Sequence, residues 1–377
     1  MSQNGCGIIC EYNPFHNGHK YQIDKVKSLG ADYVVCVMSG DFVQRAEPCF
    51  QDKMIRAKNA VMSGADIVLE LPFPYSSMSA EGFCKAGVEI LSKSALCSNI
   101  AFGSECGDIQ KLTKTAQTLN TSFYNDVIAL QKENPSLSFA RARQSLIEKQ
   151  LGSEYSIVLE NPNDILAVEY IRANLLLENP LVPLPIKRTT PRGGFDEVFA
   201  SSSFIRKSIT ENDNLEFALS KVPDGADMSQ TFSDFSAFYS SMLINLMLKT
   251  PEQLSDIAEV VTGFEHSIIK NAKNACDFDE LLSLLSSKTV TGSKIRRMLL
   301  FAFFGVTKQM VKEDIKYTSI LALSDKGKQV LRQKAKDSGI ILASRISDIK
   351  GDSEAFRQYS FARNCREVLY KCIIPRS

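Results

Sequence analysis

The stretch GCGIICEYNPFHNGHK, residues 5–20, joins a short apolar run to the start of a helix through a turn that contains two histidines. The run Gly7–Cys10 predicts a buried strand, and the pattern from Gly18 to Leu29 predicts a helix. A continuous apolar strand followed at once by a helix is typical of a parallel sheet that is covered by helices on both faces. This stretch therefore predicts an α/β fold.

The alternation of strands and helices continues through the first 110 residues. Three further apolar runs predict strands and two helical patterns lie between them, at residues 33–38, 52–63, 67–71, 79–93 and 99–102. A helix is expected at 163–177 and a late strand at 184–188, while the polar helical pattern of 108–150 indicates an insertion. The predicted fold class is α/β, with a Rossmann-like parallel sheet in the N-terminal part.

Helical patterns dominate the second half of the chain. A helix is expected at 202–210 behind a serine-rich cap, and strand signals become sparse after about residue 211. The later helices are predicted at residues 235–248, 251–261, 278–285, 294–304 and 308–316. These patterns predict two domains, one of residues 1–210 and a mainly helical one of residues 211–377.

The charges are unevenly distributed along the chain. The 377 residues carry 44 Lys and Arg against 43 Asp and Glu, so the formal net charge is only +1. Residues 211–287 hold 4 basic and 13 acidic side chains, whereas residues 288–377 hold 19 basic and 8 acidic ones. A basic excess this local favours RNA as a partner over a merely solvated surface. The RNA-binding candidates are Lys294, Arg296, Arg297, Lys328 and Arg332, with a further basic cluster at Arg363, Arg366 and Lys371.

Composition excludes several other classes of protein. With 44% apolar residues the chain has ample material for a packed core. No apolar run approaches the roughly 18–20 residues that span a bilayer, and no secretion signal is visible, so no membrane association is expected. The ten cysteines include no Cys-x-x-Cys pair, so a zinc site is not expected. Free thiols favour a reducing compartment, and the predicted location is the cytoplasm.

Two of the three histidines, His16 and His19, stand in the turn between the first strand and the first helix. A doubly wound sheet places its ligand crevice here, and the N-terminus of the helix offers free N–H groups to a phosphate. Two imidazoles can also donate hydrogen bonds to phosphate oxygens as charge builds in a transition state. The alternatives are a metal site, which would need a third ligand, and a histidine that only caps the helix. We favour phosphate contact and predict no metal ligands.

The sequence His-Asn-Gly-His at residues 16–19 resembles the signature of the HIGH-type nucleotidyltransferases, whose reactions take place at the α-phosphate of ATP. The other signature of that superfamily is a Ser/Thr-rich turn that opens a late helix with a basic residue. Residues 201–206 resemble it, and they follow the histidines in the same chain order. The resemblance implies that hydroxyls of this turn and the guanidinium of Arg206 hold the β- and γ-phosphates.

Five stretches together resemble the tRNA(Met) cytidine acetate ligase family: residues 11–19, 38–45, 64–72, 102–105 and 161–166. The resemblance is dense over residues 5–210 and thinner afterwards. It implies that ATP and acetate form acetyl-adenylate, and that the acetyl group passes to the N4 amine of the wobble cytidine of elongator tRNA(Met). The implied partners are ATP, acetate and elongator tRNA(Met), with Mg²⁺ expected beside ATP. The oligomeric state is left open.

The same resemblance assigns the residues of the site. The implied catalytic residues are His16, His19, Lys20 and Arg206. The implied ATP-binding residues are Gly7, Ile8, Ile9, Cys10, Glu11, Tyr12, Asn13, Pro14, Phe15, His16, Asn17, Gly18, His19, Lys20, Gly103, Asn163, Arg188, Ser201 and Ser203. The chain departs from the family pattern at Asp41, Ala46 and Ser202, where Asn, Gly and Ala are usual.

Other functions and roles stay open on the sequence alone. A small-molecule adenylyltransferase of the same superfamily would need both motifs but no basic C-terminal region. An RNA-binding protein with a regulatory nucleotide site would not turn over acetate. Arg45, Lys53 and Arg56 are expected either to face tRNA or phosphate or to lie on a solvated helix face. Glu70 and Glu105 are expected either to orient a substrate or to cap local structure.

Overall fold

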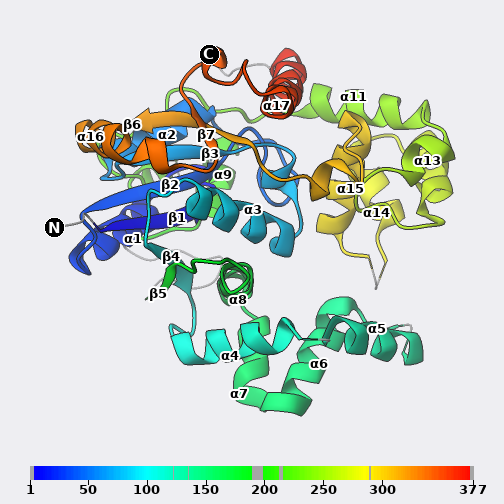
Figure 1. The fold of residues 1–377 in the computed structure, drawn as a ribbon. Helices are drawn as coiled ribbons and strands as arrows, with labels where there is room; N and C mark the ends of the chain where they lie inside the picture. Colours follow the sequence, from blue (N-terminus) through cyan, green and yellow to red (C-terminus); the bar gives the residue numbers. More distant parts are fainter. Residues whose placement is uncertain are drawn as a thin grey trace.

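The computed structural model describes residues 4–121, 123–134, 136–188, 198–211, 215–287 and 290–373. A seven-stranded sheet in the order β5-β4-β1-β2-β3-β6-β7 forms the centre of the molecule (Figure 1). Its strands are β1 Gly5–Cys10, β2 Tyr33–Ser39, β3 Ile67–Leu71, β4 Asn99–Ser104, β5 Val182–Lys187, β6 Tyr317–Leu323 and β7 Ile341–Ala343. The first five strands are parallel to one another, so their carboxyl ends meet at one edge. The predicted α/β fold is confirmed.

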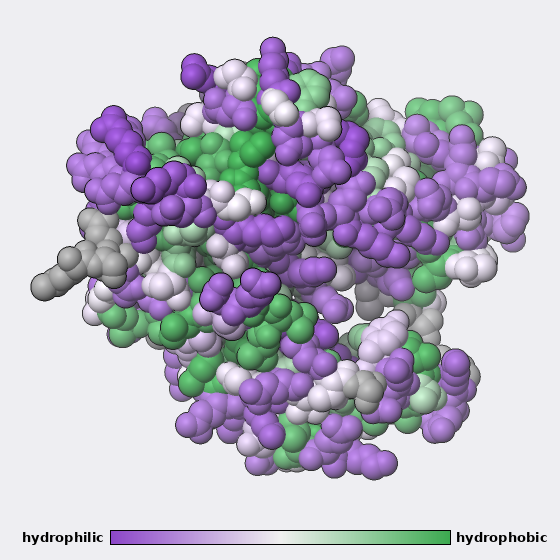
Figure 2. All heavy atoms as spheres, in the orientation of Figure 1, coloured by the Kyte–Doolittle hydropathy of each residue, from purple (hydrophilic) through white to green (hydrophobic). Residues whose placement is uncertain are grey.

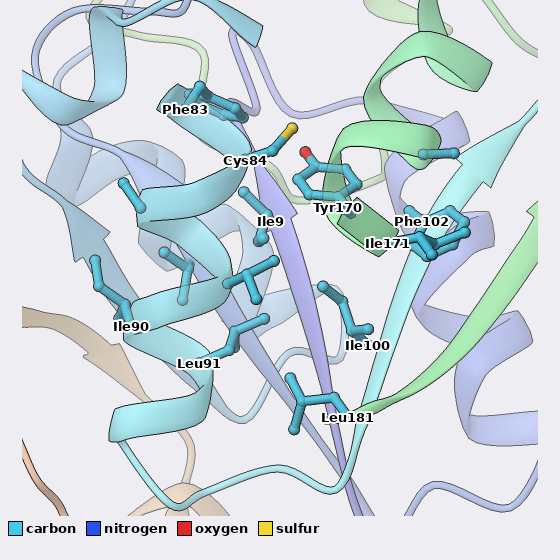
Figure 3. Close-up of a cluster of buried hydrophobic side chains, with 14 of the residues drawn as sticks. Ile9, Phe83, Cys84, Ile90, Leu91, Ile100, Phe102, Tyr170, Ile171 and Leu181 are labelled. Atoms are coloured by element: carbon cyan, nitrogen blue, oxygen red, sulfur yellow. The ribbon is translucent and has the colours of Figure 1, made fainter. Parts of the chain in front are cut away.

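Four helices cover the two faces of the parallel strands: α1 Asn17–Ser28, α2 Lys53–Met62, α3 Ala80–Lys93 and α8 Pro162–Asn174. Successive side chains of a strand point to opposite faces. Ile8 of β1 therefore packs with α1 and α2, whereas Ile9 packs with α3 and α8. Figure 3 shows the second face, where Ile9 and Ile100 lie between the two helices. Burial on both faces explains why these strands read as continuous apolar runs.

Two helical units extend from the sheet (Figure 1). The arm between β4 and β5 contains α4 Ile109–Leu119, α5 Phe123–Glu133, α6 Phe139–Leu151 and α7 Ser153–Ser156. After α9 Ser202–Thr210 and α10 Leu215–Leu219, the bundle contains α11 Ser236–Met247, α12 Pro251–Ser255, α13 Phe264–Asn274, α14 Phe278–Leu285 and α15 Gly292–Phe304. The core of the bundle includes Phe42 and Phe73 from the loops after β2 and β3. The bundle thus packs directly on the carboxyl edge of the sheet.

The last part of the chain returns to the sheet. β6 pairs antiparallel with β3, with Leu323 opposite Ile67, and β7 pairs parallel with β6. Two helices flank these strands, α16 Asp325–Lys334 and α17 Ser353–Cys372. The segment expected to be mainly helical therefore also supplies two strands, and these complete the sheet built by the N-terminal residues.

Two predicted helices differ from the structure: the helix expected at 251–261 ends already at Ser255, and the helix expected at 308–316 is not formed. Residues 308–316 contain only the short turn Met310–Lys312 among the regular elements. Tertiary contacts override the local pattern here: the carbonyl oxygen of Glu313 accepts a hydrogen bond from Tyr75 at 3.2 Å, and its carboxylate pairs with Arg357 at 2.5 Å. Among the described residues, no helix is both long and apolar enough to cross a membrane.

Candidate nucleotide-binding and catalytic site

The turn that follows β1 is held from several sides. Tyr12 takes a left-handed backbone conformation with φ of 48°, which is uncommon for a residue with a bulky side chain. The side chain of Asn13 accepts a hydrogen bond from the N–H of Phe50 at 2.7 Å. The fully buried Arg56 donates to the carbonyl oxygen of Glu11 at 2.6 Å. Arg56 faces neither phosphate nor solvent, because backbone carbonyls at the sheet edge surround its guanidinium.

His16 ends this turn and caps α1. Its Nδ1 accepts a hydrogen bond from the N–H of Gly18 at 3.0 Å, and its own N–H donates to Nδ1 of His19 at 3.3 Å. The two imidazole rings stack with their centroids 3.7 Å apart. A Cβ at Gly18 would lie 2.9 Å from Cε1 of His16, so glycine is needed at this position to leave room for the ring.

Both histidines are neutral at physiological pH. Burial lowers the pKa of His16 to about 3, and the nearby charge of Arg188 acts in the same direction. Burial, His16 and Arg188 together lower the pKa of His19 well below its ordinary value. Because Nδ1 of each ring accepts a backbone hydrogen bond, the single proton of each neutral ring lies on Nε2. Each ring therefore has one N–H donor left, which suits a phosphate oxygen.

The serine-rich turn lies directly against the histidine turn. Nη1 of Arg206 donates to the carbonyl oxygen of Asn13 at 2.6 Å, across 193 positions of sequence. The hydroxyl of Ser202 donates to the carbonyl oxygen of Pro14 at 3.4 Å, and Ser201 caps α9. The fold thus brings the two sequence motifs into contact.

A cavity opens beside the histidines at the carboxyl ends of β4 and β5. It is lined by His16, Gly18, His19, Tyr21, Gln22, Gly103, Ile186, Lys187, Arg188 and Phe199. Five of these are among the predicted ATP-binding residues. A concave site with apolar walls and a few convergent polar groups is the usual form of a site for a small organic ligand.

Other predicted residues do not line this cavity. Lys20 pairs with Asp24 at 2.6 Å on the surface of α1. Asn163 stands in the first turn of α8, where its side chain donates to Glu105 at 2.6 Å. The carboxylate of Glu105 also accepts backbone N–H groups of this turn, so Glu105 caps local structure. Ser203 is exposed in the first turn of α9.

The predicted residues Gly7, Ile8 and Ile9 position the turn rather than line the cavity. They form the interior of β1, and the side chains of Ile8 and Ile9 belong to the two cores. A Cβ at Gly7 would lie 2.7 Å from the side chain of Leu91, so this glycine allows α3 to pack closely on the strand.

A network of buried and half-buried charges lies at the carboxyl ends of β2 and β3. Nζ of Lys53 lies 3.0 Å from Asp41 and 2.5 Å from Glu70. Arg366 of α17 lies 2.6 Å from both Asp41 and Asp52. Two cations thus compensate the carboxylate of Asp41. Sequence reasoning missed this network because Arg366 stands 325 positions from Asp41 and no local pattern links them.

The basic residues predicted to bind RNA do not form one surface. Arg296 pairs with Glu47, and Arg297, which is only 8% exposed, lies 3.6 Å from Glu259. Lys294 lies near the start of the same helix, α15. Lys328 and Arg332 belong to α16, at the opposite side of the view in Figure 1, where Figure 2 shows a hydrophilic surface. The candidates therefore lie in two separate places.

Comparison with known proteins agrees with the fold and with the resemblance to the HIGH-type nucleotidyltransferases. The family model of HIGH Nucleotidyl Transferase matches residues 3–375. A tRNA(Met) cytidine acetate ligase of Acetivibrio thermocellus is 34% identical over 366 residues, which cover 91% of this chain and 88% of that protein. The protein of the same name from Caldanaerobacter subterraneus subsp. tengcongensis is 35% identical over 387 residues, covering 97% and 95%.

Solved structures give the same result. The apo crystal structure of Thermotoga maritima TmcAL matches with a TM-score of 0.87 and 28% identity, covering 95% of this chain and 92% of that one. The structure of Thermotoga maritima TmcAL bound with alpha-thio ATP matches with a TM-score of 0.84, and the match again covers 95% of this chain and 92% of that one. The chain belongs to the HIGH nucleotidyl transferase family and, within it, to the tRNA(Met) cytidine acetate ligases.

Proposed function

We propose that this protein uses ATP to activate acetate as acetyl-adenylate and transfers the acetyl group to the N4 amine of the wobble cytidine of elongator tRNA(Met). The observation that carries the proposal is the pair of neutral, stacked histidines that share one cavity with Arg188. Arg206 approaches the same turn from α9. This arrangement supplies donors and positive charge for a triphosphate at the sheet edge where nucleotides bind.

In the first step an oxygen of acetate attacks the α-phosphorus of ATP, and the bond to pyrophosphate breaks. Acetate is already ionised at neutral pH, so no general base is needed. Catalysis then rests on positioning and on stabilising the charge of the transferring phosphoryl group. We assign this stabilisation to the Nε2–H groups of His16 and His19, and the holding of the β- and γ-phosphates to Arg206 with Ser201 and Ser203. Lys20, Asn163 and Arg188 are proposed to complete the ATP site.

In the second step the cytosine amine attacks the carbonyl carbon of the mixed anhydride and AMP leaves. The amine is a weak nucleophile, so orientation of the base dominates this step. An anticodon base is already single-stranded, and presenting it costs little unpairing energy.

Acetate and Mg²⁺ belong to the proposal as well. Mg²⁺ is usually held by substrate phosphates together with one or two carboxylates, and we propose that it enters with ATP. Among the described residues, no three His, Cys, Asp or Glu side chains gather in a geometry that would hold a metal ion. A cytoplasmic location is proposed because the tRNA substrate is found there.

The experiment is a reaction of the purified protein with ATP, radiolabelled acetate and elongator tRNA(Met). Mass spectrometry of the anticodon nucleosides should show N4-acetylcytidine, and AMP and pyrophosphate should be released. A requirement for acetyl-CoA would contradict the proposal. Pyrophosphate release with acetate but no tRNA product would favour a small-molecule adenylyltransferase instead.

A further inference from the structure

A second cavity, of about 320 Å³, lies at the opposite side of the sheet edge from the histidines. Its walls come from the start of α2, from β3, β6 and β7, and from α17, which lie together in the upper part of Figure 1. The size lies at the lower end of the range for small-ligand sites, roughly 300–1,000 Å³. None of the residues assigned to ATP lines it, so it is a separate site.

The floor of this cleft offers buried polar groups that are not fully used. Tyr317 is 1% exposed, and its hydroxyl makes no hydrogen bond to any described residue. Glu70 is 4% exposed; its Oε1 binds Lys53, while Oε2 has no hydrogen-bond partner within the described part of the chain. Neither oxygen is among the fully enclosed atoms of the described residues that lack a partner, so both reach the open space of the cleft, where a ligand or water can bind them. They would accept hydrogen bonds from an amine.

The wall and the rim have different chemistry. The ring of Tyr359 is half-buried in the wall and meets Tyr317 edge-on at 5.7 Å, which leaves an aromatic surface beside the floor. Arg345 and Arg363 stand at the mouth with side chains 80% and 54% exposed. Each pairs with an acidic residue three or four positions away, and such exposed pairs exchange readily for a phosphate. The cleft thus combines an amine acceptor, an aromatic surface and two exchangeable guanidinium groups.

Together these features match one nucleotide of a single-stranded RNA. We propose that the cleft binds a nucleotide of the tRNA next to the cytidine that is acetylated. Its base lies by Tyr359 with an exocyclic amine directed to Glu70, and its phosphate lies on Arg345 and Arg363. Strands of a sheet are about 4.8 Å apart, so Glu70 on β3 is about 10 Å from the end of β1, a spacing that suits a neighbouring nucleotide. This inference rests on the proposed function.

The first test removes the two guanidinium groups. In Arg345→Ala/Arg363→Ala, the KM for tRNA should rise about tenfold, and the salt dependence of tRNA binding should become shallower by about one to two units of log–log slope. Exchange of pyrophosphate into ATP in the presence of acetate should stay unchanged, which also shows that the variant is folded. The control Lys270→Ala/Lys273→Ala removes two exposed charges from α13 and should behave as wild type.

The second test addresses the base. Anticodon stem–loop RNAs with an abasic site on either side of the target cytidine are compared in wild type and in Ser319→Phe, which fills the cleft. One of the two abasic RNAs should lose about fivefold or more in kcat/KM with wild type. With Ser319→Phe, the kcat/KM for that abasic RNA should be no lower than the kcat/KM for the intact RNA. An equal penalty in both proteins, or no penalty at either position, would overturn the inference.

The failures of the two proposals can be told apart. If wild type does not acetylate tRNA, the proposed function itself is wrong. If wild type acetylates tRNA but Arg345→Ala/Arg363→Ala keeps its KM, only the assignment of the cleft is wrong. Inhibition by free AMP tests whether the cleft instead binds a free nucleotide. If Arg345→Ala/Arg363→Ala loses only its inhibition by AMP and keeps its tRNA kinetics, the cleft is a site for a free nucleotide and the inference is overturned.

Discussion

At the scale of single residues, the stacked pair His16 and His19 dominates the site. Each ring keeps one Nε2–H, and removal of a preorganised donor to a transferring group costs about 10²–10³ in rate. We expect His19→Ala to lower acetate-dependent pyrophosphate exchange at least a hundredfold while tRNA binding persists. His266→Ala, at an exposed position of α13, is the matched control and should retain full exchange. Near-normal exchange in His19→Ala would remove the histidines from the mechanism.

The buried histidines also predict how stability depends on pH. The pKa of His16 is about 3 in the folded protein, below the value of about 6.5 in the unfolded chain. Between these values the unfolded state binds more protons, so the free energy of unfolding falls as the pH falls below about 6.5. The slope approaches about 1.4 kcal/mol per pH unit for each such histidine.

Urea unfolding at pH 7 and pH 5 measures this slope. His16→Asn keeps a side chain that caps a helix well but removes the titrating group. The variant should lose less stability than wild type between the two pH values. An identical loss would show that His16 is accessible to protons in the folded state.

At the scale of elements, α17 is tied to the sheet edge by Arg366. Removing one partner of a buried ion pair leaves the other charge uncompensated. Arg366→Ala should lower the free energy of unfolding by about 2 kcal/mol, and Asp41→Asn by less, because Lys53 and Arg366 then still have Glu70 and Asp52. The double variant should lose less than the sum of the two, as measured by urea unfolding in a double-mutant cycle. Strict additivity would mean that the two side chains do not interact.

Local signals decide which elements could be predicted. The helix at 202–210 is observed at Ser202–Thr210, because Ser201 supplies its cap from the neighbouring position. The strands β1 to β4 were predicted because burial on both faces requires apolar runs. The prediction of a helix at 308–316 was wrong because Tyr75 and Arg357, which are far away in sequence, bind Glu313 in this segment.

The same distinction applies to the site. The sequence identified His16, His19 and the turn at 201–206, since each motif is contiguous. It could not identify the burial of Arg56 or the pairing of Arg366 with Asp41, because these depend on which segments the fold brings together.

At the scale of the whole molecule, the return of β6 to β3 makes the C-terminal residues part of the catalytic fold. A chain that ends at residue 310 would expose the long edge of β3 and lose the contacts of α17. We expect this truncated protein to be largely insoluble, and its remaining soluble fraction to show no pyrophosphate exchange. The measurement compares the solubility and the circular dichroism spectrum of the truncated protein with those of the full-length protein. A soluble, active truncated protein would show that the sheet is stable without β6.

The position of β6 also has a consequence for biosynthesis. The ribosome completes β3 at residue 71, but the strand that covers its edge is finished only at residue 323. At a rate of synthesis of about 5–20 residues per second, the edge of the nascent sheet stays open and apolar for about 10–50 s. During this interval the emerging chain is most exposed to aggregation. Elongation rate and chaperone capture therefore influence the yield of active enzyme independently of the stability of the finished fold.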